Sequence, residues 1–183
     1  DIKLIDLSHP IEHHMTVYPG DSEVTLMETH KFAADGYSNH QLNINMHAGT
    51  HIDGPMHLLQ AEKHICELPL EQFIGAGAIL NVSGCSIIDY KESYEQLVPE
   101  HCILILYTGY GSCYGEDRYY TEHPSLTVQF AQFLIRKKVK MIGFDMPSPD
   151  HYPYSIHKLL FKQNILIAEN LTNVEQLLHT TAF

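Results

Sequence analysis

The pattern of apolar and polar positions along this chain predicts strands early and alternating strands and helices late. Residues 1–7 alternate roughly as a strand does, and residues 41–47 alternate strictly between polar and apolar side chains. The second pattern predicts a half-buried strand with Leu42, Ile44 and Met46 on its apolar face.

The second half of the chain supplies the longer elements. Apolar runs at 76–82 and 102–107 predict buried strands. The later pattern predicts a helix over 126–138, a strand over 139–144, a short helix over about 155–162 and a strand over 165–168 ending at Glu169. These elements predict a mixed α/β fold with part of the sheet antiparallel. No internal repeat or linker divides the sequence, so one domain over residues 1–183 is expected.

Eleven residues that follow the predicted strand carry the strongest chemical signal. His47, His51, Asp53 and His57 all stand at odd positions, so in an extended segment their side chains point to one side. Glycines and a proline between them allow the chain to bend around an ion. Imidazole and carboxylate are usual ligands of zinc and similar divalent ions. The spacing therefore favours a catalytic metal site over a set of polar loop residues that only satisfy backbone groups, and His57 is the candidate proton carrier.

Charge and composition exclude several classes of function. The net charge is −11, from 22 acidic and 11 basic residues, which opposes binding to a nucleic-acid backbone. No run of about 18 apolar residues occurs, so no membrane-spanning helix is expected. The four cysteines form no CxxC pair, and this favours a reducing compartment, hence a cytoplasmic location.

The segment from His47 to His57, HAGTHIDGPMH, resembles the HxGTHxDxPxH signature of the metal-dependent cyclase family. That family includes bacterial kynurenine formamidases and isatin hydrolases. Further segments similar to the family follow in the expected order, at 6–8, 18–21, 108–109, 123–124, 142–145, 155–157 and 167–169. The resemblance covers nearly the whole chain and implies a single mixed-sheet domain of the swivelling β/β/α type.

The resemblance also implies a site with two metal ions. The implied ligands are His47, His51, Asp53, His157 and Glu169. The first three would hold one ion, Asp53 would bridge to the second, and His57 would act as general acid and base. Two zinc ions per chain are expected, with manganese as an alternative. Without the resemblance, His157 and Glu169 fit a helix-surface histidine and a solvated strand-end carboxylate better.

The implied reaction is hydrolysis of an amide by metal-bound hydroxide, with an arylformamide such as N-formylkynurenine as the small-molecule substrate. A lactam hydrolase or cyclase similar to isatin hydrolase is one alternative, and a metal-binding protein without catalysis is another. A homo-oligomer, dimer or tetramer, is expected from the family. The chain has no Trp, so other aromatic residues would line the substrate pocket. The candidates are Tyr18, Phe32, Tyr37, Tyr107, Tyr110 and Tyr114, although ordinary packing explains each of them better.

Overall fold

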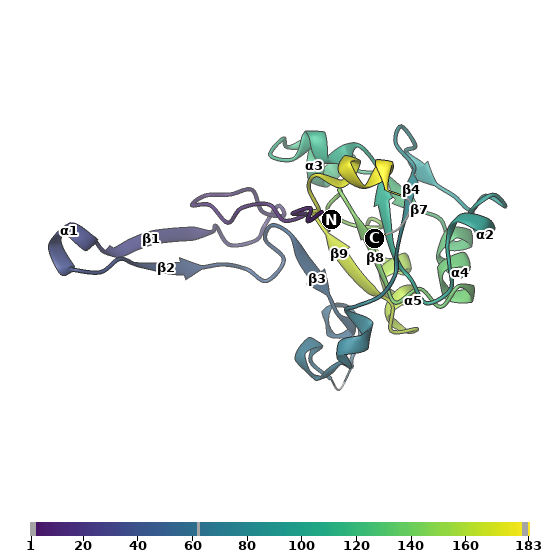
Figure 1. Ribbon diagram of the computed structural model, residues 1–183, viewed down its shortest axis with the longest axis horizontal. Helices are drawn as coiled ribbons and strands as arrows, with labels where there is room; N and C mark the ends of the chain where they lie inside the picture. Colours follow the sequence, from purple (N-terminus) through teal and green to yellow (C-terminus); the bar gives the residue numbers. More distant parts are fainter. Residues whose placement is uncertain (1–2, 62, 181–182) are drawn as a thin grey trace.

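A five-stranded sheet with the order β3-β9-β8-β6-β4 forms the centre of the computed structural model, which describes residues 3–61, 63–180 and 183 (Figure 1). Four strands run parallel: β4 (Gly77–Asn81), β6 (Ile103–Tyr107), β8 (Met141–Phe144) and β9 (Leu166–Glu169). The edge strand β3 (His51–Asp53) is antiparallel to β9. The sheet is therefore mixed, as the sequence predicts.

Helices cover one face of this sheet because the parallel strands are added in one direction. Right-handed crossovers between such strands put their connections on the same side. The connecting helices are α2 (Tyr94–Leu97), α4 (Val128–Arg136) and α5 (Ser155–Phe161). Shorter elements complete the chain: β5 (Ile87–Ile88), β7 (Ser125–Leu126), α3 (Arg118–Thr121), η1 (Pro55–His57), η2 (Ile65–Glu67), η3 (Leu70–Gln72), η4 (Tyr110–Cys113) and η5 (Val174–His179).

The central strands contribute apolar side chains to both faces of the sheet, which explains their continuous apolar runs. In β6, Leu104 belongs to the core on the helical face, together with Phe130 and Phe133 of α4. The next residue, Ile105, belongs to the core on the opposite face, where Leu177 of η5 packs. The predicted strands at 76–82, 102–107, 139–144 and 165–168 and both predicted helices are confirmed, with ends that differ by a few residues.

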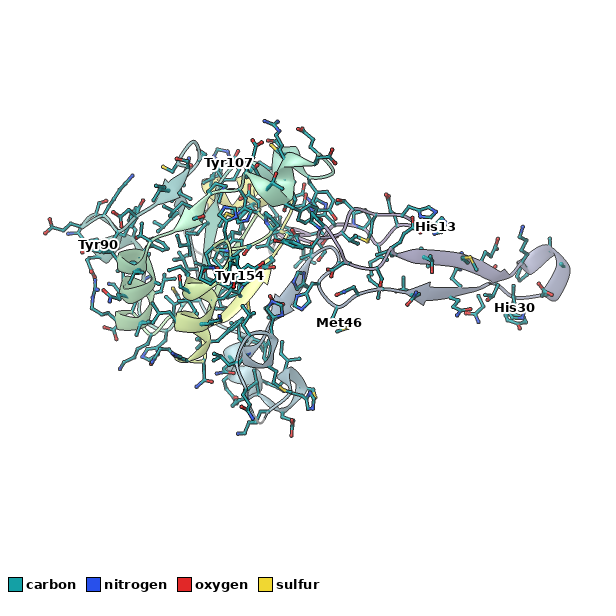
Figure 2. The ribbon with its side chains drawn as sticks, turned by 180° about the vertical axis from the view of Figure 1, so that it is seen from behind. His13, His30, Met46, Tyr90, Tyr107 and Tyr154 are labelled. Atoms are coloured by element: carbon teal, nitrogen blue, oxygen red, sulfur yellow. The ribbon has the colours of Figure 1, made fainter. Side chains whose placement is uncertain are left out.

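A long arm leaves the body of the molecule between the N-terminal segment and β3 (Figure 1). It consists of β1 (Thr25–His30), the one-turn helix α1 (Phe32–Asp35) and β2 (Asn39–Asn43), and its two strands pair only with each other in the described chain. In Figure 2, His30 lies near the far end of the arm and Tyr154 lies in the body.

The arm corrects the prediction of a half-buried strand over 41–47. The strand ends at Asn43, all of its residues are exposed, and Met46 is 81% exposed. Alternation identified a strand correctly, but period 2 cannot tell whether the apolar side meets the core of the same chain.

The predicted strand over 1–7 is also wrong for the residues that the structure describes. Residues 1–2 lie outside them, and residues 3–7 form no strand. Only Ser8 makes an isolated bridge, to Leu171 just beyond β9, because β3 already occupies the edge of β9. Among the described residues, no helix has the length and apolarity needed to span a bilayer.

Candidate metal site and adjoining cavity

The sheet register and the connections between strands bring the six residues singled out from the sequence together near the carboxyl end of β9. Because β3 is antiparallel to β9, the first residue of β3, His51, lies opposite Glu169, the last residue of β9. Asp53 follows two residues later in β3, and His57 ends η1. His157 lies in the first turn of α5, on the connection between β8 and β9.

Three side chains from the His-x3-His-x-Asp segment form a compact triangle of ligand atoms. His47 Nδ1 lies 2.9 Å and His51 Nε2 lies 3.2 Å from Asp53 Oδ1. The two imidazole nitrogens are 3.2 Å apart. Ligands bound tetrahedrally to zinc at the usual bond lengths lie about 3.3 Å from one another. The spacing of these atoms therefore fits a shared metal ion.

Glu169 joins this triangle to His157. Glu169 Oε2 is 3.4 Å from His51 Nε2, and Glu169 Oε1 is 3.3 Å from His157 Nε2. Three buried atoms of the cluster, Asp53 Oδ2, His157 Nε2 and Glu169 Oε1, make no hydrogen bond within the described structure. Buried polar atoms are rarely left without a partner, so these atoms fit ligands of a cation.

His57 lies at the edge of the cluster. Its Nε2 is 3.8 Å from Asp53 Oδ2, its ring is 4.0 Å from that of His47, and its side chain is 33% exposed. Two groups of three potential ligand atoms lie within 4.8 Å of one another among the described residues, and both contain Asp53. One adds His51 and Glu169, and the other adds His47 and His57. Asp53 is thus the common member of both groups.

The buried carboxylates attract positive charge to this cluster. Burial lowers the pKa of His51, but Asp53 and Glu169 outweigh it and raise the pKa to about 10. Burial also lowers the pKa of His157, and Asp150 and Glu169 raise it to about 9. Burial raises the pKa of Asp53, whereas the neighbouring imidazoles of His47 and His51 bring it well below the usual range. A proton or a divalent cation supplies the charge that these carboxylates favour.

The pKa of His57 shifts in the opposite direction from those of His51 and His157. Burial lowers its pKa below the ordinary value, and the nearby Asp53 offsets only part of that effect.

Hydrogen bonds on the outer side of the cluster fix the tautomers of two histidines. His157 Nδ1–H donates to Asp150 Oδ1 at 2.7 Å, so the lone pair of Nε2 faces Glu169. Asp150 Oδ2 also accepts from the backbone N–H of Ile156 at 2.6 Å. His51 Nδ1–H donates to the Gly49 carbonyl at 2.9 Å, which leaves Nε2 free to act as a ligand.

The Gly49 carbonyl is held in turn by a buried polar network. Asn170 Nδ2 donates to it at 2.9 Å, and Tyr119 donates to Asn170 Oδ1 at 2.9 Å. Thr50 Oγ1 donates to the Asn170 carbonyl at 2.6 Å. Sequence patterns missed Asn170 and Tyr119, because each donates a hydrogen bond to a residue far away in the chain. Asp150, which was also missed, is close to His157 in sequence, and the proline-rich loop that contains it was the one local signal.

A cavity of about 210 Å³ opens beside the cluster and is lined by His47, His57, His157 and Glu169. Its aromatic lining comes from Tyr18, Tyr120 and Tyr154, of which Tyr154 is labelled in Figure 2. The remaining lining residues are Asp21, Leu58, Pro147, Ser148 and Asn170.

Only one of the six aromatic residues named as pocket candidates lines this cavity. Tyr18 does, whereas Phe32 and Tyr37 belong to the arm. Tyr114 stacks on His9 with ring centroids 3.7 Å apart. The other two, Tyr107 and Tyr110, do not line it either. Tyr120 and Tyr154 were missed because they lie on the connections between parallel strands. Local sequence patterns do not specify where such connections bring their side chains.

Comparison with known proteins agrees with the fold and the signature. Residues 5–151 match the family model Cyclase, described as "Putative cyclase". This match spans most of the chain, so the protein belongs to the cyclase family.

Two relatives are kynurenine formamidases. The protein from Bacillus cereus is 31% identical over 172 residues, covering 91% of this chain and 81% of the relative. The one from Bacillus anthracis is 30% identical over 174 residues, covering 92% and 82%. The resemblance predicted from the signature is therefore confirmed, and the chain is kynurenine formamidase-like in sequence.

Solved structures share the fold. Isatin hydrolase A from Labrenzia aggregata, solved with benzyl benzoate, superposes with a TM-score of 0.79 at 21% identity, covering 94% of this chain and 81% of the other. Isatin hydrolase A from Ralstonia solanacearum gives a TM-score of 0.81 at 16% identity, covering 94% and 80%. The mixed α/β fold class expected from the sequence is confirmed.

The outer hydrogen bonds generate a prediction for Asp150. Replacing Asp150 with Asn removes the charged acceptor that orients His157, and loss of such a partner typically weakens metal binding about 10–100-fold. We expect the Asp150→Asn variant to show that loss in a zinc competition titration with a chromogenic chelator. The matched control is Asp89→Asn, because Asp89 is an exposed carboxylate that accepts a hydrogen bond from Thr127 and does not belong to the cluster. Equal zinc affinity in the wild type and Asp150→Asn would contradict the orienting role.

Proposed function

We propose that this chain is a metal-dependent hydrolase that cleaves arylformamides such as N-formylkynurenine. The observation that carries the proposal is the buried cluster of imidazoles and carboxylates centred on Asp53, next to a cavity lined by aromatic side chains. The relatives at 30–31% identity, which are named kynurenine formamidases, support the same reaction class.

We assign zinc to the site, at two ions per chain. His47, His51 and Asp53 would hold one ion, and Asp53, His157 and Glu169 would hold the other. The triangle of ligand atoms around Asp53 Oδ1 supports the first set, and the unpartnered Nε2 and Oε1 atoms support the second. Manganese takes the same ligand types, so it is the alternative ion.

A divalent ion at such a site acts as a Lewis acid on a carbonyl oxygen and increases the acidity of water. We assign proton transfer to His57, because it lies beside Asp53 and lines the cavity next to the ligand cluster. It accepts a proton as water adds to the formyl carbon and returns one to the aniline nitrogen as the C–N bond breaks. Formate and an arylamine are the products, so the atoms of water and substrate balance.

The cavity supplies binding for the aryl group. Tyr18 and Tyr120 meet edge to face, with ring centroids 5.6 Å apart. Tyr154 packs edge to face on His157 at 5.8 Å, so it joins the aromatic lining to the ligand cluster. Flat rings pack well against such surfaces. This arrangement supports an aromatic amide rather than an aliphatic one.

The expected homo-oligomer has a physical argument in the arm. An isolated two-stranded hairpin is only marginally stable in water, and exposed apolar patches usually mark a contact surface. The apolar side chains that this arm exposes are Met27, Phe32, Tyr37 and Leu42. We propose that a second copy of the chain covers this arm, in a dimer or tetramer. A cytoplasmic location remains a prediction from the sequence.

The hydrolase assignment predicts turnover of N-formylkynurenine by the zinc-loaded protein and a loss of kcat in the His57→Gln variant. General acid–base groups contribute typically about 10²–10⁴-fold, so we expect a loss of that size. The measurement is steady-state kinetics combined with metal analysis, and His101→Asn, which removes an exposed histidine, is the control.

The outcome distinguishes several alternatives. Zinc content should be unchanged in His57→Gln; its loss would instead make His57 a ligand together with His47 and Asp53. Turnover of a lactam such as isatin without turnover of formanilides would favour the lactam hydrolase. Metal binding without turnover of either kind of substrate would favour the third alternative, a metal-binding protein without catalysis.

The oligomer assignment predicts that aspartates at the end of the arm separate the subunits. Phe32→Asp combined with Tyr37→Asp places charges where an apolar contact is proposed, so the mass in sedimentation equilibrium should fall to that of a monomer. Leu97→Asp, at a residue that is 57% exposed on α2, should leave the mass unchanged. A monomeric wild type at micromolar concentration would refute the proposal.

A further inference from the structure

A second pocket lies at the end of the sheet opposite the ligand cluster. Its walls come from η3, from α4 and from the turns that lead into the amino ends of β8 and β9, whereas the ligand cluster lies near the carboxyl end of β9. The pocket has a volume of about 340 Å³ and is lined by Gln72, Ile135, Lys138, Val139, Lys140, Gln163, Asn164 and Ile165. The proposed hydrolysis uses none of these residues.

Two helix ends form part of the wall of this pocket. The helices α4 and α5 are each followed by a residue with a left-handed backbone, Lys138 at φ 51° and Asn164 at φ 55°. In each case the next backbone N–H donates to a carbonyl of the last helical turn at 3.1 Å. This motif satisfies carbonyls that a helix end otherwise leaves free. Within the described structure, the Lys138 ammonium makes no hydrogen bond, so helix capping does not occupy it.

The pocket is positively charged, although the net charge of the chain is −11. Its charged residues are Lys138 and Lys140, and none of the described residues that line it is Asp or Glu. The preceding basic residues, Arg136 and Lys137, both pair with Glu95 at 3.2 Å. In the part of the chain that the structure describes, no carboxylate forms an ion pair with either pocket lysine. The pocket therefore contains two cations that no acidic side chain neutralises.

Lys140 is held in position by backbone carbonyls. Its ammonium donates to the carbonyls of Glu71 and Ile74, at 2.8 Å and 2.9 Å. An ammonium group has three N–H donors, so one donor remains for a ligand. Lys140 is half-buried, and a charge that is partly removed from water is stabilised by an anionic partner.

Uncharged side chains complete the pocket. The apolar ones are Ile135, Val139 and Ile165, and the amides are those of Gln72, Gln163 and Asn164. The Oε1 atom of Gln72 is buried without a hydrogen-bond partner in the described structure, so protein contacts do not fix this amide. Amide N–H groups and ammonium groups donate to an anion, and the apolar side chains offer a surface to an organic group attached to it. The lining therefore fits an organic anion.

We propose that this pocket binds a small phosphate monoester, with its phosphate against Lys138 and Lys140 and its organic group on the apolar side chains. A phosphate monoester carries a charge of about −1.5 to −2 near pH 7 and presents three acceptor oxygens. That charge matches two ammonium groups, whereas a carboxylate matches only one. The inference is independent of the proposed hydrolysis, because the pocket shares no residue with the ligand cluster or its cavity.

The test is isothermal titration calorimetry of the zinc-loaded protein with phenyl phosphate. Benzoate serves as the monoanion and benzyl alcohol as the uncharged compound, and the expected order of affinity is phosphate, carboxylate, alcohol. Lys138→Gln removes an exposed charge and should weaken phenyl phosphate binding about two- to fivefold. Lys140→Gln removes the positioned donor and should weaken it about tenfold or more. Lys162→Gln, at an exposed lysine outside the pocket, is the control and should bind as the wild type does.

Backbone amide chemical shifts locate the bound phosphate. Phenyl phosphate should shift the amide resonances of Lys138, Val139 and Ile165, and less so in Lys138→Gln. Shifts confined to the surroundings of His51 and Glu169 would place the phosphate on the metal cluster and overturn the inference. No binding at millimolar concentration, equal affinity for benzoate and phenyl phosphate, or wild-type affinity in Lys138→Gln would also overturn it. If Lys140→Gln fails to fold, Lys138→Gln alone decides. Neither measurement uses turnover, so a failure of the proposed function leaves this test intact.

Discussion

Burial of the Asp53 and Glu169 carboxylates is the constraint on which the candidate site depends. Both are among the most buried polar residues of the described chain, and a buried charge is costly unless it is paired. The structure meets this cost by surrounding them with imidazoles, three of whose nitrogens lie 2.9–3.4 Å from a carboxylate oxygen. Such a cluster is a poor core, and the spacing of its atoms fits the ligands of a divalent cation.

The fold makes that cluster possible through one antiparallel pairing. Strand β3 is the only antiparallel member of the described five-stranded sheet, and its register sets His51 against Glu169. The parallel connection through α5 then brings His157 to the same end. Asp150 and the Asn170–Gly49 contact hold the imidazoles from outside, so the ligand atoms are oriented by the protein itself.

The sequence predicted what is local and missed what depends on tertiary contacts. The segment from His47 to His57 carries its ligands within eleven residues, so their convergence follows from spacing and bends. His157 and Glu169 became candidates only through the family resemblance, because their proximity depends on strand register. The same reason explains the missed tyrosines, Tyr120 and Tyr154. The strand predicted over 41–47 was expected to be half-buried, but the observed strand is exposed along its length. Alternation of polar and apolar residues predicts a strand without identifying the surface that its apolar side contacts.

The most direct test of the central claim is the metal content of the purified protein and of its Asp53→Asn variant, measured by mass spectrometry together with formanilide turnover. Asp53 belongs to both groups of ligand atoms, so the account predicts about two zinc ions per wild-type chain and loss of both ions and of turnover in the variant. An Asp53→Asn variant that keeps the wild-type metal content and full turnover would contradict it.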